Sequence, residues 1–149
     1  MFTRAITTIA FIAASSMPGF ARDEIAGPVS AEILQVIDGD TLLVAARPWP
    51  QQTVEVYVRI RGIDTPEMRS KCAAVRRAGL DARKVLEKLT GNSPQVQLTR
   101  ISGDKYFGRI LADVTLADGR NPAQYMLGEG IAVAYDGGRK QKAPCPDEE

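Results

Sequence analysis

The sequence predicts a mainly β chain with helices, built as a five-stranded barrel with a helix inserted after the third strand and a short C-terminal helix. Five short segments alternate apolar and polar residues with the period of a strand, and turn residues separate them. After the third segment, the spacing of apolar residues changes to that of an amphipathic helix. This order fits a closed or nearly closed barrel better than a sandwich or a parallel sheet, and closure leaves few exposed strand edges.

The five strand-like segments are residues 31–37, 41–46, 53–60, 95–100 and 109–116. The dipeptide Asp38-Gly39 is a strong signal for a two-residue hairpin turn. In the third segment the valines alternate with Glu55, Tyr57 and Arg59, so the pattern directs Arg59 out of the core. The helical spacing covers residues 73–89 and ends at Gly91, and Asn121-Pro122 has the form of an N-cap followed by a first helical residue.

The first 21 residues have the features of a secretory signal peptide. Arg4 precedes an apolar run at 5–14, and small residues stand at the cleavage positions before residue 22. A membrane anchor is the alternative, but this run is shorter than the roughly 20 residues that a span needs. We therefore expect a secreted or periplasmic protein without stable membrane association after cleavage. Residues 22–29 are then a short lead, 30–136 one domain and 137–149 a polar tail.

The composition limits the chemistry that is available. The chain has 149 residues and 44% hydrophobic residues, enough for one core, and it has no histidine. Imidazole bases, histidine triads and histidine metal sites are therefore excluded, and carboxylates must transfer protons or bind metal. The net charge is +1, and the predicted leader carries one charged residue, Arg4, so the mature chain is neutral. Any binding to polyanions must come from local basic clusters.

Cys72 and Cys145 are the two cysteines of the chain. An even pair in an exported protein predicts a disulfide, which would tie the tail to the domain, although free thiols remain the alternative. Nothing in the sequence demands a partner subunit, so we expect a monomer.

Two acidic residues stand where strands begin and end. Asp40 follows the first turn, and Asp64, with Thr65 beside it, follows the third strand. Hard cations such as Ca²⁺ bind carboxylate and carbonyl oxygens, so these residues are candidate metal ligands. Ordinary turn residues with the same spacing are the alternative.

Three further residues suit phosphate chemistry. Arg59 and Arg109 would neutralise the charge of a pentacovalent phosphorane, and Glu67 would act as a general base on water. Surface salt bridges and a helix-terminal glutamate are the alternatives that spacing leaves open.

Three motifs in this order resemble the staphylococcal nuclease (thermonuclease) family: VIDGDT at 36–41, RIRGIDTPE at 59–67 and DKYFGRILA at 104–112. The resemblance covers about 31–135. It implies a barrel of the OB type and Ca²⁺-dependent hydrolysis of DNA and RNA phosphodiesters that leaves 3′-phosphate ends. By matching position it implies Asp40, Asp64 and the Thr65 carbonyl as calcium ligands.

The same resemblance gives roles to other residues. Arg59 and Arg109 would bind the phosphate, and Glu67 would activate the attacking water. Tyr106 matches a tyrosine that contacts the terminal phosphate, Lys105 beside it is a further candidate for substrate binding, and Tyr135 resembles the aromatic residue on which a base stacks. Phe107 departs from the family pattern because it lengthens this loop by one residue.

The alternatives to a secreted nuclease are a catalytically weak or inactive OB-type module that binds nucleic acid or protein, and a structural envelope protein.

Overall fold

The computed structural model describes residues 23–140 and 144–146. The predicted signal peptide, residues 1–21, lies outside the described residues. The strands are β1 Glu24–Ile25, β2 Val29–Val36, β3 Thr41–Arg47, β4 Val54–Ile60, β5 Gly62–Asp64, β6 Gln95–Gly103, β7 Arg109–Leu116 and β8 Val133–Tyr135. The helices are α1 Ala73–Thr90 and α2 Pro122–Gly128.

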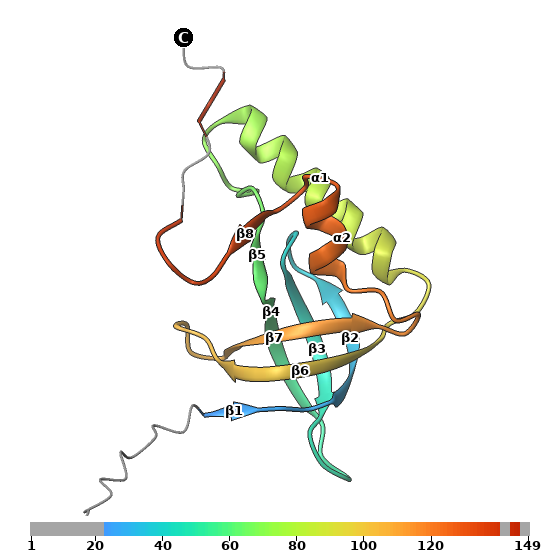
Figure 1. Ribbon diagram of the computed structural model, residues 1–149. Helices are drawn as coiled ribbons and strands as arrows, with labels where there is room; N and C mark the ends of the chain where they lie inside the picture. The colour runs from blue at the N-terminus through green and yellow to red at the C-terminus, as the bar shows by residue number, and fades with distance from the viewer. Residues whose placement is uncertain (1–22, 141–143, 147–149) are drawn as a thin grey trace, which may run out of the picture.

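Five strands close into a barrel (Figure 1). β2 pairs with β3, β3 with β4, β4 with β7, β7 with β6, and β6 returns to β2. The β4–β7 pair is parallel and the other pairs are antiparallel. The predicted five-stranded barrel with an inserted helix and a short C-terminal helix is therefore confirmed.

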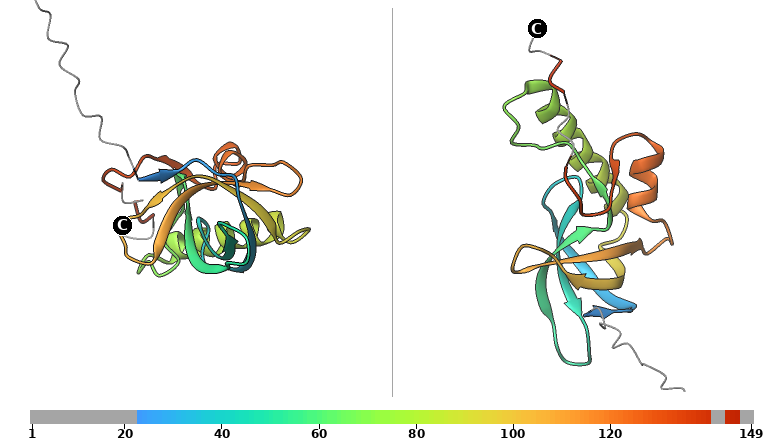
Figure 2. Two further views of the ribbon diagram at one scale, coloured as in Figure 1. Left: turned by 90° about the horizontal axis from the view of Figure 1, so that it is seen from below. Right: turned by 60° about the vertical axis from the view of Figure 1, so that its left-hand side comes forward.

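Both helices lie on the side of the barrel away from β1 (Figures 1 and 2). α1 buries the apolar face that its spacing predicts, including Ala82 and Leu86, which are fully buried. α2 begins as expected, because the Asn121 side chain accepts a hydrogen bond from the backbone N–H of Gln124 at 3.2 Å. None of the helices in the described part of the chain is long and apolar enough to cross a membrane.

The N-terminal lead predicted at residues 22–29 takes part in the folded domain. β1 pairs with Ile101 and Ser102 of β6, and Val29 is a buried residue of β2. β6 extends to Gly103, beyond residues 95–98 that pair with β2, so β1 supplies hydrogen-bond partners to the remainder of that edge. The folded domain thus begins before residue 30.

A disulfide joins Cys72 to Cys145, with 5.7 Å between their Cα atoms. Cys72 immediately precedes α1, so the bond attaches the C-terminal tail to the beginning of this helix. The tail is thereby connected to the same end of the molecule as the short β5–β8 pair.

Candidate active site

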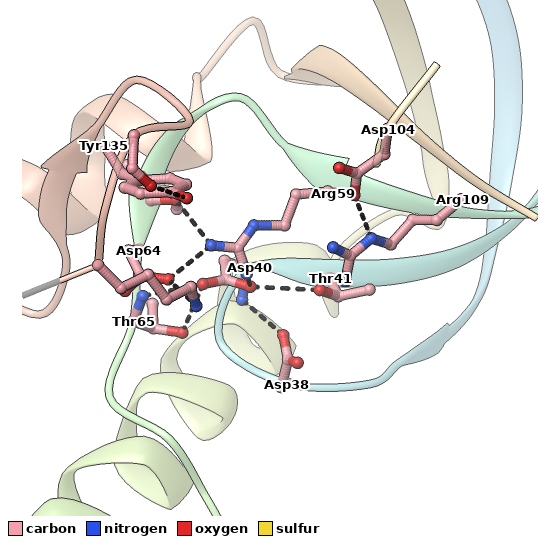
Figure 3. A network of polar contacts seen from close by, with 12 residues as sticks. Asp38, Asp40, Thr41, Arg59, Asp64, Thr65, Asp104, Arg109 and Tyr135 are labelled. Carbon is pink, nitrogen blue, oxygen red and sulfur yellow. Dashed lines mark hydrogen bonds and ion pairs between the residues drawn. The ribbon is translucent and has the colours of Figure 1, made fainter. Parts of the chain in front are cut away.

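One guanidinium joins two carboxylates, one just before β3 and one at the end of β5 (Figure 3). Arg59, on β4, donates from Nη1 to Asp40 Oδ1 and from Nη2 to Asp64 Oδ1, the latter at 2.6 Å. Asp40 immediately precedes β3, and Asp64 ends β5. Because one planar group contacts both carboxylates, they lie close enough to share a single cation.

Arg59 does not reach solvent as the strand alternation predicts. Its exposed fraction is 9%, and its neighbours Val58 and Ile60 are also buried. The outer face of β4 is covered at this end, since Arg59 donates a hydrogen bond to the Ile63 carbonyl at 3.2 Å and lies 6.0 Å from the centre of the Tyr135 ring. The short β5–β8 pair thus converts an outward-facing arginine into a buried one.

The Asp40 carboxylate is buried, with 1% exposure, and accepts several hydrogen bonds. Thr65 donates to Oδ2 from its backbone N–H at 2.8 Å and from its hydroxyl at 2.9 Å. The Thr41 hydroxyl donates to Oδ1 at 3.2 Å, and Asp38 Oδ1 accepts the backbone N–H of Asp40 at 3.0 Å. Asp38 and Thr65 therefore orient Asp40.

The two carboxylates differ in their electrostatic setting. Burial raises the pKa of Asp40 from 3.8 to about 6, although Arg59 and Thr65 oppose this shift. Burial also opposes ionisation of Asp64, but hydrogen bonds from Lys140 and Arg59 outweigh it and lower the pKa of Asp64. For Arg59, burial disfavours the charged form, whereas Asp40 and Asp64 hold its pKa above the ordinary value.

Two glycines allow the elements around Asp40 to approach closely. A Cβ on Gly39 would lie 2.8 Å from the Ala82 Cβ and 2.8 Å from the Thr65 Oγ1. A Cβ on Gly79 of α1 would lie 2.5 Å from the Pro66 carbonyl oxygen. The expected two-residue turn at Asp38-Gly39 is instead a connection of residues 37–40 between β2 and β3, and Gly39 serves packing against α1.

A small cavity lies beside Asp40. It encloses about 30 Å³, and its lining residues are Asp38, Asp40, Arg59, Thr65, Pro66, Glu67, Met68 and Lys140. This volume suits an ion or a water molecule rather than a nucleotide. Glu67 is exposed at the rim, where its Oε1 accepts the backbone N–H of Arg69 at 2.9 Å.

The donor chemistry of this site fits calcium. The acidic side chains offer hard oxygen atoms, and Asp40 and Asp64 converge on one cationic group. The described residues hold no cluster of three or more acidic, cysteine or histidine side chains arranged for a metal. A bound calcium ion would therefore need water or phosphate oxygens beside these two carboxylates and the Thr65 carbonyl.

Arg109 and its loop form a second polar group. Arg109 Nε donates to Asp104, and its guanidinium lies 4.6 Å from the centre of the Tyr106 ring, while Lys105 lies 5.3 Å from that ring. Phe107 is fully exposed, so the longer loop projects this side chain into solvent.

The pairing of β4 with β7 places the two arginines on the same outer face. Arg109 stands opposite Tyr57, which is two residues before Arg59 on β4. Among the described residues, however, no hydrogen bond or ion pair joins Arg109 to the group around Asp40. Asp104, which the sequence did not single out, holds Arg109 instead.

Lys140 belongs to the basic tail and was not among the site residues named from the sequence. Its Nζ donates to Asp64 Oδ1 at 2.6 Å and lies 5.9 Å from the centre of the Tyr135 ring. The sequence predicted a polar tail at residues 137–149 that a disulfide would tie to the domain. The cysteine pairing was the available signal, because a bond to Cys72 returns the tail to the region between β5 and α1.

Comparisons with known proteins find a matching family model and a similar curated protein. A family model described as Staphylococcal nuclease homologue matches residues 57–147. A curated Escherichia coli protein with the name "Uncharacterized endonuclease" is 32% identical over 108 residues. That alignment covers 72% of this chain and 62% of the relative, so the chain spans less than two thirds of the relative's length.

Proposed function

We propose that this chain, which belongs to the family of staphylococcal nuclease homologues, is a calcium-dependent nuclease that hydrolyses phosphodiester bonds in DNA, RNA or both. The observation that carries the proposal is the convergence of Asp40 and Asp64 on Arg59, beside a cavity that Glu67 also lines. The name of the Escherichia coli relative supports an endonuclease rather than another phosphodiesterase.

Asp40, Asp64 and the Thr65 carbonyl would hold the calcium ion. When bound, calcium would supply positive charge that stabilises the phosphorane and a fixed position for phosphate oxygens. Arg59 would bind a phosphate oxygen with the donors that it now directs to the carboxylates, and Arg109 would approach from the same face of the β4–β7 pair.

Glu67 is the proposed general base. It is exposed at the cavity rim, so its carboxylate can take a proton from a water molecule that attacks phosphorus. The new P–O bond forms as the bond to the 5′ oxygen breaks. The leaving oxygen takes a proton from solvent, and the products are a 3′-phosphate and a 5′-hydroxyl.

We further propose that the protein is exported and works as a monomer outside the cytoplasm. The leader-like residues 1–21 and the disulfide between Cys72 and Cys145 both support an oxidising compartment. After cleavage of the leader, no stable association with the membrane is expected.

The proposal is tested by digestion of plasmid DNA and of RNA with the purified mature protein, in calcium and in EGTA. We expect cleavage in calcium and its loss in EGTA. Glu67→Gln should lose about 10²- to 10⁴-fold in rate while it still binds calcium, because it removes the base and not the ligands. No cleavage in calcium by a folded sample would refute a nuclease.

A binding module remains the second candidate, because Arg109 is engaged by Asp104 and not by the group around Asp40. If the protein is a nuclease, the Arg109→Ala variant should cleave nucleic acid orders of magnitude more slowly than wild type. Tight binding of oligonucleotides that survives in Glu67→Gln, together with no turnover by wild type, would favour a binding module.

A further inference from the structure

The C-terminal segment after β8 turns back toward the site. The Tyr135 hydroxyl donates to the Gly138 carbonyl at 2.8 Å, and Asp136 Oδ1 accepts the backbone N–H of Gly138 at 3.1 Å. Gly137 has a φ of 96°, which favours glycine, so the sequence permits the reversal at this position. This turn directs Lys140 to the carboxylate of Asp64.

A covalent bond holds the tail on the far side of Lys140. Cys145 is bonded to Cys72, which lies between the Glu67 loop and α1. Lys140 is therefore positioned between two attachments, the Tyr135 turn and the disulfide. This double attachment limits the conformational freedom that an ordinary surface lysine loses when it binds a ligand.

Lys140 and Arg59 meet at one oxygen atom. Both donate to Asp64 Oδ1 at 2.6 Å, and both line the small cavity. Their exposure differs, since the side chain of Arg59 is 10% exposed and that of Lys140 is 51% exposed. Arg59 thus forms the inner wall of the site and Lys140 its outer edge.

We propose that Lys140 is a phosphate-binding residue of this site, and that the disulfide-bonded tail positions its side chain to contact the nucleic acid. The inference rests on the proposed nuclease function and names a substrate contact for it. Lys140 receives the backbone phosphate at the mouth of the site, beside the Tyr135 ring on which a base can stack.

The charges around the cavity explain why a phosphate needs this lysine. The acidic residues that line or adjoin the cavity are Asp38, Asp40, Asp64 and Glu67. These carboxylates repel a phosphodiester, and the cations of the cavity lining are Arg59 and Lys140. Lys140 is the more accessible of the two, and its flexible stem allows the ammonium to move from Asp64 to a phosphate oxygen.

The test measures binding without turnover, in the Glu67→Gln protein with calcium. A fluorescent single-stranded oligonucleotide is the probe, and its anisotropy reports Kd over a series of salt concentrations. Lys140→Met should weaken binding about three- to tenfold, as expected for one exposed charge contact. The slope of log K against log salt should become less steep by about 0.7, the value for one lost contact with a single strand.

Arg139→Met is the matched control, since Arg139 is exposed and makes no hydrogen bond or ion pair with another residue that the structure describes. Its Kd should stay within about twofold of the parent, because Arg139 does not line the cavity and an exposed charge outside the site is screened by salt. Reduction of the disulfide should weaken binding by the parent to the level of Lys140→Met. It should cause little further loss in Lys140→Met, since both changes remove the same contact.

Equal losses in Lys140→Met and Arg139→Met, or no loss in Lys140→Met, would overturn the inference. Calcium affinity is measured in parallel by calorimetry. Tighter calcium binding by Lys140→Met with unchanged oligonucleotide binding would also overturn it, because Lys140 would then only compete with the ion at Asp64. Digestion by wild type in calcium and in EGTA tests the nuclease function separately. If Lys140→Met weakens oligonucleotide binding and Arg139→Met does not, but wild type cleaves nothing, the nuclease function is refuted and the role of Lys140 in binding stands.

Discussion

Asp40 is an acid that pairs with an arginine and still has a raised pKa. The ion pair with Arg59 lowers the pKa, but burial raises it more, and the result is about 6. Burial disfavours a charge strongly when water is replaced by protein, and Arg59 is shared with Asp64. The proton affinity of this site is therefore set by how deeply the barrel end encloses Asp40.

This shift predicts a pH dependence of calcium binding. Between about pH 4 and pH 6 the folded protein binds a proton at Asp40 that the unfolded chain releases. The contribution of Asp40 to stability is thus fully present below about pH 4 and is lost as pH rises through about 6. A calcium ion held by Asp40, as proposed, would displace this proton, so its affinity should fall about tenfold between about pH 7 and pH 5.

Calorimetric titration of metal-free protein with calcium at these two pH values checks the prediction. Glu67→Gln is the control and should retain the same pH dependence, because its carboxylate is not a proposed calcium ligand. An affinity that is equal at both pH values would show that Asp40 does not bind the ion through a protonatable carboxylate.

Individual site residues were predictable from the sequence where a motif fixed the residue type, and less so where distant segments meet. The resemblance named Asp40 and Asp64 as calcium ligands, and in the structure both carboxylates accept hydrogen bonds from Arg59. Lys140 was not named as a site residue because its place beside Asp64 depends on the turn at residues 135–138, which the strand and helix periodicities do not encode, although the disulfide that ties the tail was predicted. Its role in the site is a matter of tertiary contacts.

At the level of elements, alternation predicted the strands but not how their outer faces are covered. Val58 of β4 is buried as expected, but Val54 is 44% exposed, and Arg59 is buried because β5 and β8 pair over the end of the strand. β5 and β8 have three residues each, too short for a clear periodic signal. Short strands such as β5 and β8, which form by pairing with each other, are thus the part of the fold that sequence patterns do not predict.

Gly39 provides a test at this level. In Gly39→Ala the new methyl group meets Ala82 and Thr65, each at 2.8 Å, and one of them must move. We expect a loss of about 1–3 kcal/mol in the free energy of unfolding, and weaker calcium binding because Thr65 orients Asp40.

Thermal or denaturant unfolding measures this loss, and Gly103→Ala in β6 is the matched control. A Cβ at Gly103 meets no atom within 4 Å, so its stability should change by no more than about 0.5 kcal/mol. If the two variants unfold at the same midpoint, close packing of α1 against the β2–β3 connection is not what requires glycine at position 39.

At the scale of the whole molecule, the disulfide connects the tail to the domain across 73 residues of sequence. The bond restricts the unfolded chain, and a disulfide typically contributes about 2–4 kcal/mol to stability, with long closed loops at the upper end of this range. The double variant Cys72→Ser, Cys145→Ser should therefore lose that amount of its free energy of unfolding, and its unfolding midpoint should lie at a lower denaturant concentration than that of wild type. The loss should be global, since the enclosed segment contains α1, β6, β7, α2 and β8.

Unfolding of wild type with and without a thiol reductant separates the bond from the substitutions. Reductant should shift the wild-type midpoint toward that of the double variant, leave the double variant unchanged, and add the mass of two hydrogen atoms to wild type. If neither mass nor midpoint responds, the cysteines are free thiols and the tail is not fixed beside Asp64 by a bond. The same result would remove the covalent attachment that delivers Lys140, while the turn at Tyr135 would remain.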